Sequence, residues 1–180
     1  MPPAPPCIFD QETIAARVRD LGREIRTRYP DGSLTLLCIL KGSALFAADL
    51  ARAVPGDVEL SFVQARSYGD GTTSSGAVEV GVLEEEVVHD RRVIVVDTIL
   101  DTGRTLTEVV NAVRGAGAAE IATCVLLDKK ARRTVDIRPD FRGFESPDRF
   151  LVGYGLDYAG RYRTLAYIGA LGEDGSTESA

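Results

Sequence analysis

Three continuous apolar runs constrain the fold of this chain more than any other feature. They are Leu34–Leu40 (LTLLCIL), Val93–Val96 (VIVV) and Ile121–Leu127 (IATCVLL). A run without polar alternation is typical of a strand that is buried on both faces, as in a parallel sheet covered by helices. Segments of helical character lie between the runs. The sequence therefore predicts an α/β fold with a central, mostly parallel sheet flanked by helices.

Periodicity and turn residues predict the remaining elements. Asp10 is a suitable N-cap for the first helix, which has apolar residues on one face. We expect helices over Gln11–Tyr29, Ala44–Val54 and Arg104–Gly115, strands over Val58–Ala65, Ala77–Val82, Arg92–Val96, Phe150–Gly155 and Thr164–Ile168, and loops over Ser67–Gly76 and Asp97–Gly103. Ligands of such folds bind at the carboxyl ends of the strands. Three loops are therefore candidates for a site: Lys41–Ser43, Asp97–Thr105 and Asp128–Lys130.

Length and composition fit one domain over residues 1–180, with flexible ends over about 1–9 and 172–180. The net charge of −6 argues against a nucleic-acid binder, which usually has a basic surface. The chain has no apolar run long enough for a membrane helix, and its first residues do not resemble a signal peptide. Three scattered cysteines are typical of a reducing compartment. We therefore expect a cytoplasmic protein with no nucleic-acid and no membrane partner.

A single histidine, His89, nearly excludes Ser-His and Cys-His catalysis and histidine-rich metal sites. The segment Val93–Leu106 (VIVVDTILDTGRTL) points to different chemistry. An apolar strand leads into a polar loop, and a helix follows at once. Backbone N–H groups at a helix N-terminus, together with threonine hydroxyls and a glycine, form a phosphate cradle. The same residues also fit an ordinary turn in which Asp and Thr cap the helix.

The segment VIVVDTILDTGRTL resembles the phosphoribosyl-pyrophosphate (PRPP) binding motif of the type I phosphoribosyltransferases. The resemblance extends from about Leu34 to Ile168. Leu40-Lys41-Gly42 resembles the pyrophosphate loop of that family, and Ser67-Tyr68 resembles the start of its mobile catalytic loop. Lys129 and the run Pro139–Arg163 resemble the purine-binding end of the hypoxanthine-guanine branch.

This resemblance implies a type I phosphoribosyltransferase fold with a small hood over the sheet. It implies transfer of 5-phosphoribosyl from PRPP to N9 of hypoxanthine or guanine, giving IMP or GMP and pyrophosphate. The residues implied are Asp101 as general base; Asp97, Thr98, Asp101, Thr102, Gly103, Arg104 and Thr105 for the 5′-phosphate and ribose; Lys41, Gly42, Ser67, Tyr68 and Arg163 for pyrophosphate; and Lys129, Phe150, Leu151 and Asp157 for the purine. It also implies a magnesium ion at Asp97 and Asp157, and a homodimer or homotetramer.

Lysine usage supports two of these positions. Only three of the 21 basic residues are lysines, namely Lys41, Lys129 and Lys130. A lysine retained where arginine serves elsewhere suggests a site that needs a compact ammonium group. In the family, the ammonium group at the position of Lys129 donates to O6 of the purine, so 6-oxopurines should be accepted and adenine rejected.

The sequence departs from the family at one position. The family usually has two adjacent acids before the DTG loop, whereas this chain has Asp97-Thr98. Thr98 can form hydrogen bonds but supplies no charge for PRPP or magnesium. We therefore expect Thr98→Asp to tighten PRPP or magnesium binding, or to leave it unchanged.

Two other functions remain open from the sequence. A bifunctional uracil phosphoribosyltransferase that regulates RNA shares the DTGRT loop, although no basic patch stands out here. A PRPP-sensing protein without catalysis is favoured only by Thr98. Release of pyrophosphate from PRPP with hypoxanthine, guanine, xanthine or uracil would separate the three.

Overall fold

The computed structural model describes residues 4–67 and 78–172. Its elements are β1 (Cys7–Phe9), α1 (Gln11–Arg28), β2 (Leu34–Leu40), α2 (Ala44–Ala53), β3 (Val58–Ser67), β4 (Val78–Val80), the 3-10 turn η1 (Glu85–Val87), β5 (Arg92–Leu100), α3 (Arg104–Gly115), β6 (Glu120–Asp128), β7 (Phe141–Glu145), β8 (Phe150–Val152) and β9 (Ile168–Leu171). The helices begin where the sequence predicts. Asp10 accepts a 2.7 Å hydrogen bond from the backbone N–H of Thr13, as expected of an N-cap. None of these helices is both long and apolar enough to cross a membrane.

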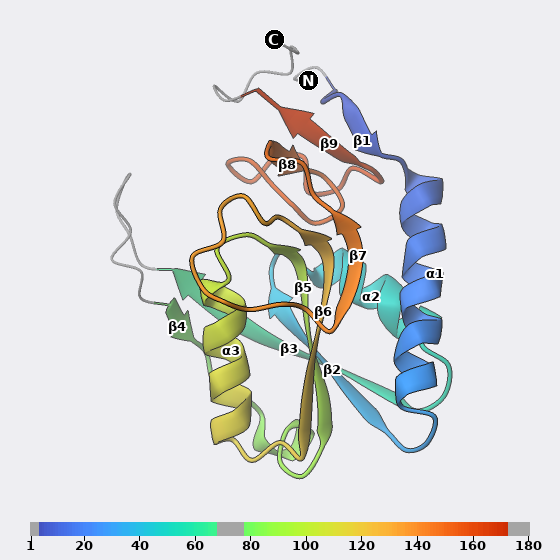
Figure 1. Cartoon of the computed structure of the whole chain (residues 1–180), viewed down its shortest axis with the longest axis vertical. Helices are drawn as coiled ribbons and strands as arrows, with labels where there is room; N and C mark the ends of the chain where they lie inside the picture. The colour runs from blue at the N-terminus through green and yellow to red at the C-terminus, as the bar shows by residue number, and fades with distance from the viewer. Residues whose placement is uncertain (1–3, 68–77, 173–180) are drawn as a thin grey trace.

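The central sheet has six strands in the order β4-β3-β2-β5-β6-β7 (Figure 1). Strands β3, β2, β5, β6 and β7 run parallel, and only β4 is antiparallel to its neighbour. This confirms the predicted α/β architecture with a mostly parallel sheet. The apolar runs are buried because helices cover both faces of the sheet.

The two faces of the sheet have separate cores. Helices α1 and α2 pack on one face, where Ile14, Leu21 and Phe46 meet alternate residues of β2 and β5. Helix α3 packs on the other face through Leu106 and Val109. Two-sided burial holds the sheet rigid, so the loops at its carboxyl edge start from fixed positions.

A second, three-stranded antiparallel sheet, β1-β9-β8, forms the hood at the upper end of Figure 1. The expectation of a flexible segment over 1–9 is wrong for Cys7–Phe9, which pairs with β9. Phe9 also stacks on Phe144, with ring centroids 4.4 Å apart. The predicted strand Thr164–Ile168 is also wrong, because the strand there is Ile168–Leu171. The predicted flexible end over 172–180 lies outside the described residues except for Gly172.

Strand β5 is longer than the sequence predicts. The loop expected over Asp97–Gly103 begins only at Asp101, because residues up to Leu100 stay in register with β6. Polar side chains at Asp97 and Thr98 suggested a loop, but their backbones pair with the neighbouring strand. The extension carries β5 to the carboxyl edge of the sheet, so Asp101 emerges beside the end of β6.

The sequence did not predict β7, the last strand of the central sheet. Its backbone carbonyl groups are contacted by α1: Arg17 donates from Nε to the carbonyl oxygen of Gly143 over 2.9 Å, and from Nη2 to that of Arg142 over 2.5 Å. Arg17 also pairs with Glu24 at 2.6 Å, which orients the guanidinium along the strand.

Candidate active site

A cavity of about 820 Å³ lies where the carboxyl ends of the central strands face the hood. Its wall contains eight of the residues that the sequence singles out: Lys41, Gly42, Asp101, Lys129, Phe150, Leu151, Asp157 and Arg163. These residues come from five separate segments of the chain. The fold therefore brings together residues that are up to 122 positions apart in the sequence.

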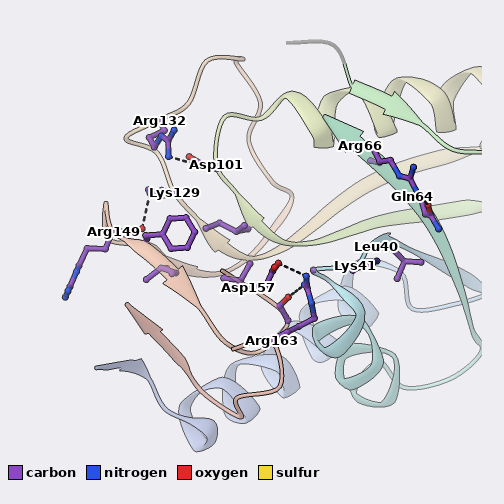
Figure 2. Close-up of a pocket in the computed structure, with 17 residues that line it drawn as sticks. Leu40, Lys41, Gln64, Arg66, Asp101, Lys129, Arg132, Arg149, Asp157 and Arg163 are labelled. Carbon is purple, nitrogen blue, oxygen red and sulfur yellow. Dashed lines mark hydrogen bonds and ion pairs between the residues drawn. The ribbon is translucent and has the colours of Figure 1, made fainter. Parts of the chain in front are cut away.

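Asp101 is the first residue after β5 and faces the cavity. Its Oδ1 atom is buried and has no hydrogen-bond partner within the described chain. Its Oδ2 atom lies 3.8 Å from a guanidinium nitrogen of Arg132 (Figure 2). Burying a carboxylate oxygen without a partner is costly, and such groups are found where a ligand completes the contact. Asp101 is thus placed to accept a proton from a bound molecule.

The turn after Asp101 requires the glycine at position 103. Gly103 precedes α3 with a φ of 91°, a conformation that residues with a Cβ rarely adopt. A Cβ there would also lie 2.7 Å from a methyl group of Ile137. The turn therefore keeps the first backbone N–H groups of α3 beside Asp101, where they can bind an anion.

Lys129 follows β6 directly and is almost fully buried, with 5% of its surface exposed. Its Nζ atom donates to the carbonyl oxygen of Arg149 over 3.1 Å and lies 3.1 Å from the carboxylate of Asp148. Its backbone N–H donates to the carbonyl oxygen of Leu100 over 2.9 Å, so the ends of β5 and β6 are joined. The ammonium group is held in a fixed position on the cavity wall.

Phe150 begins β8, and 45% of its surface is exposed, which is unusual for a phenylalanine beside a buried core. Its ring contacts that of Tyr158 edge to face, with centroids 5.5 Å apart. Leu151 is buried next to it. The aromatic face of Phe150 is therefore an available platform for a planar ligand.

Asp157 and Arg163 form an ion pair of 2.5 Å on the cavity wall, with about a third of each side chain exposed (Figure 2). Arg163 also donates to the carbonyl oxygen of Gly155. Lys41 and Gly42 follow β2 in the same wall, and the Leu40–Lys41 peptide bond is cis. The N–H groups of Lys41 and Gly42 donate no backbone hydrogen bond within the described residues.

Six other predicted residues do not line this cavity: Asp97, Thr98, Thr102, Gly103, Arg104 and Thr105. Residues 102–105 lie in the adjoining turn and first turn of α3. Ser67 ends β3, and Tyr68 lies outside the described residues, as does most of the predicted loop Ser67–Gly76.

The side chain of Asp97 is partly buried, and that of Thr98 is turned into the protein. The carboxylate of Asp97 accepts a 2.7 Å hydrogen bond from the N–H of Thr98, and burial raises the pKa of Asp97 to about 7. Thr98 is fully buried, and its hydroxyl group donates to the carbonyl oxygen of Gly42 over 3.0 Å. In this structure Thr98 therefore binds the protein's own backbone.

Sequence reasoning missed several basic residues around the cavity. Arg66, Arg132 and Arg149 line it, and Arg133 lies behind it. Arg133 donates to the carbonyl oxygens of Leu100, Asp101 and Ile137 and pairs with the buried carboxylate of Asp128 at 2.5 Å. A usable signal was present, because Arg132 and Arg133 follow Lys129 in a loop that the strand pattern had already placed at the carboxyl edge.

Comparison with known proteins shows the family. The phosphoribosyl transferase domain family matches residues 7–159. The hypoxanthine-guanine phosphoribosyltransferase of Bacillus subtilis is 41% identical over 164 residues, which cover 91% of each chain. The bifunctional protein TilS/HprT of Listeria monocytogenes is 40% identical over 164 residues, but this chain spans only 25% of its length. The crystal structure of a hypoxanthine phosphoribosyltransferase from Staphylococcus aureus superposes with a TM-score of 0.87 at 33% identity, covering 93% of this chain and 91% of that one. The chain belongs to the phosphoribosyltransferase family.

Proposed function

We propose that this protein is a purine-salvage enzyme that transfers 5-phosphoribosyl from PRPP to N9 of hypoxanthine or guanine. The products are IMP or GMP and pyrophosphate. The relatives that match along most of their length carry the names of hypoxanthine and hypoxanthine-guanine phosphoribosyltransferases. The observation that carries the proposal is the joint presence of Asp101, Lys129 and Phe150 on one cavity wall, because these three side chains suit a 6-oxopurine.

Each of the three groups has one task toward the base. The exposed ring of Phe150 stacks on the purine, as aromatic side chains do on any base. The buried ammonium of Lys129 donates to the exocyclic O6, and it would face the hydrogen atoms of a 6-amino group without an acceptor. The carboxylate of Asp101 accepts the proton from N7 as N9 attacks C1′ of the ribose.

The 5′-phosphate and the pyrophosphate of PRPP bind to other residues of the site than the purine does. In this proposal the turn Thr102–Thr105 holds the 5′-phosphate through the N–H groups at the start of α3. Lys41, Gly42 and Arg163 bind the leaving pyrophosphate, helped by Ser67 and Tyr68. Fixing both phosphates holds C1′ in line with N9, which lowers the entropic part of the barrier.

We propose magnesium as the cofactor, bound mainly by PRPP itself. Mg²⁺ usually keeps several waters and takes one or two protein carboxylates together with substrate phosphates. No group of three or more histidine, cysteine, aspartate or glutamate side chains is gathered for a metal within residues 4–67 and 78–172. Asp157 on the cavity wall fits such a site, whereas Asp97 does not line the wall. The ion would neutralise charge on the departing pyrophosphate.

Oligomeric state and cell compartment are also proposals. We propose a homodimer or homotetramer located in the cytoplasm. A study of Trypanosoma cruzi hypoxanthine phosphoribosyltransferase links its C-terminal region to oligomeric state, and that structure has a TM-score of 0.86 with this one. The three cysteines are free thiols, which suits a reducing compartment.

The test is to mix the protein with PRPP, magnesium and one base at a time, and to measure pyrophosphate release and nucleotide formation. We expect turnover with hypoxanthine and guanine and none with adenine or uracil. Turnover with uracil would contradict this proposal and indicate a uracil phosphoribosyltransferase instead. Binding of PRPP without turnover on any base would indicate a sensor protein.

A further inference from the structure

The hydroxyl group of Thr98 lies where three segments of the site meet. Thr98 is in β5 and is fully buried. Its Oγ1 atom donates to the carbonyl oxygen of Gly42, 56 residues earlier in the chain, over 3.0 Å. Gly155, from the segment after β8, packs against the same carbonyl group. We propose that Thr98 is a positioning residue that fixes the pyrophosphate-binding half of the site, instead of a ligand for ribose or magnesium.

The contact between Gly42 and Gly155 leaves no space for a side chain. Gly155 has a φ of 99°, and a Cβ added there would collide with the carbonyl oxygen of Gly42. The same Cβ position lies 3.8 Å from Oγ1 of Thr98. The Gly42 carbonyl is therefore confined between the Thr98 hydroxyl and the backbone of Gly155. We call this meeting point of Gly42, Thr98 and Gly155 the junction, and the Thr98 hydroxyl is the hydrogen-bond donor to the carbonyl there.

The junction continues to the charged groups of the cavity. The N–H of Gly155 donates to the carbonyl oxygen of Arg163 over 2.9 Å, and the carbonyl oxygen of Gly155 accepts from the Arg163 side chain. Arg163 pairs in turn with Asp157 at 2.5 Å. A shift of the Gly42 carbonyl would therefore also move Arg163, on the opposite side of the junction.

On the Gly42 side, the hydrogen bond restricts a flexible residue. Glycine has more backbone freedom than any other residue, so a loop containing Lys41 and Gly42 is ordered only if something holds it. Both residues line the cavity wall, and their N–H groups have no backbone acceptor within the described chain. Holding the Gly42 carbonyl limits the directions in which these donors can point.

The chemistry at position 98 explains why a threonine suits this role. An ionised aspartate only accepts hydrogen bonds, so it cannot donate to the Gly42 carbonyl and would repel it. On this proposal we expect Thr98→Asp to weaken PRPP binding, in contrast to the expectation from the sequence. This inference rests on the proposed function, because that proposal assigns the Lys41–Gly42 loop to pyrophosphate.

The matched test compares Thr98→Val, which keeps the shape and removes the donor, with Thr98→Ser, which keeps the donor. Losing one hydrogen bond and leaving a buried carbonyl unpaired should raise KM for PRPP by about 5- to 20-fold in Thr98→Val. KM for hypoxanthine should stay within about twofold of the wild type, and Thr98→Ser should behave like the wild type. Thr98→Asp should raise KM for PRPP at least as much as Thr98→Val.

Three kinetic results would overturn the inference: an unchanged KM for PRPP in Thr98→Val, an equal rise of KM for both substrates, or tighter PRPP binding in Thr98→Asp.

Hydrogen exchange of the substrate-free protein gives a second readout. Peptides over 40–46 and 153–163 should exchange faster in Thr98→Val than in Thr98→Ser, whereas peptides over 104–115 should not differ. If the two variants differ in exchange by the same amount across the whole chain, or do not differ at all, the hydroxyl group has no local positioning role.

The exchange measurement also separates this inference from the proposed function. If the wild type releases no pyrophosphate with any base, the proposed function fails, but the exchange comparison still tests the junction. If Thr98→Val does not fold, Thr98→Ala replaces it, because alanine removes the donor without placing a second methyl group against the carbonyl.

Discussion

Arg133 donates from Nε to the backbone carbonyl oxygen of Asp101 over 2.9 Å, so the candidate base is held through its main chain while its Oδ1 atom has no hydrogen-bond partner within the described residues. The same guanidinium donates to Leu100 and pairs with Asp128 at 2.5 Å. Since Lys129 follows Asp128, one arginine joins the strand ends that carry Lys129 and Asp101, the groups proposed to contact the purine and to accept its proton.

Arg133→Met should strongly destabilise the protein. It leaves the buried Asp128 carboxylate with only Arg142, whose nearest nitrogen is 3.5 Å away, and breaking a buried pair in this way costs about 3–5 kcal/mol. Urea denaturation would measure the loss. Arg132→Met is the matched control, because Arg132 is 61% exposed and its ion pair should contribute less than about 1 kcal/mol. Equal losses in the two variants would refute the special role of Arg133.

Asp101→Asn should lower kcat by about 10²- to 10⁴-fold, because an amide cannot accept the N7 proton in the transition state. Steady-state rates of pyrophosphate release would show this, and KM for PRPP should change much less. Asp136→Asn, an exposed aspartate outside the cavity wall, should retain full activity. Wild-type turnover in Asp101→Asn would remove Asp101 from the role of base.

Lys129→Gln should reduce the preference for 6-oxopurines over 6-aminopurines. The glutamine amide offers both a donor and an acceptor, so it no longer penalises an amino group at C6. The measurement is the ratio of kcat/KM for guanine and adenine. Lys130→Gln is the control, since Lys130 is 57% exposed and pairs with Glu145 at 3.2 Å. An unchanged ratio in Lys129→Gln would count against contact with O6.

Asp97 should make the protein less stable as pH rises. Burial raises the pKa of its carboxyl group from 3.8 to about 7 in the folded state, so between these values the folded protein holds a proton that the unfolded chain releases. The contribution of Asp97 to the free energy of unfolding therefore falls from about pH 4 to pH 7 and stays low above it. Denaturation of the wild type and Asp97→Asn at pH 5 and pH 8 tests this. The wild type should lose more stability than the variant, and parallel losses would contradict the raised pKa.

The sequence predicted the buried central elements better than the ends of strands and the strands of the hood. Strand Leu34–Leu40 and helix Arg104–Gly115 match the structure because strong apolar patterns and clear breaks bound them. The end of β5 was missed because Asp97 and Thr98 suggested a loop, although pairing with β6 keeps them in the sheet. Strand β1 was missed because its stability depends on β9, which lies at the other end of the chain.

The site shows a similar division. Residues in the loops that follow the apolar runs, such as Asp101 and Lys129, could be placed at the carboxyl edge from sequence alone. The roles of Arg133 and Thr98 could not, because both act through carbonyl groups of residues distant in the chain. A residue type indicates which hydrogen bonds are possible, but only the folded backbone shows which acceptor lies within reach.

The contact between Arg17 and strand β7 has a consequence for how copies of this protein can meet. An open strand edge offers a row of unpaired backbone groups to any extended peptide, which invites aggregation. Here a guanidinium group already binds two backbone acceptors of this edge strand, the carbonyl oxygens of Arg142 and Gly143. A seventh strand from another molecule would therefore have to displace this guanidinium group before it could pair with β7.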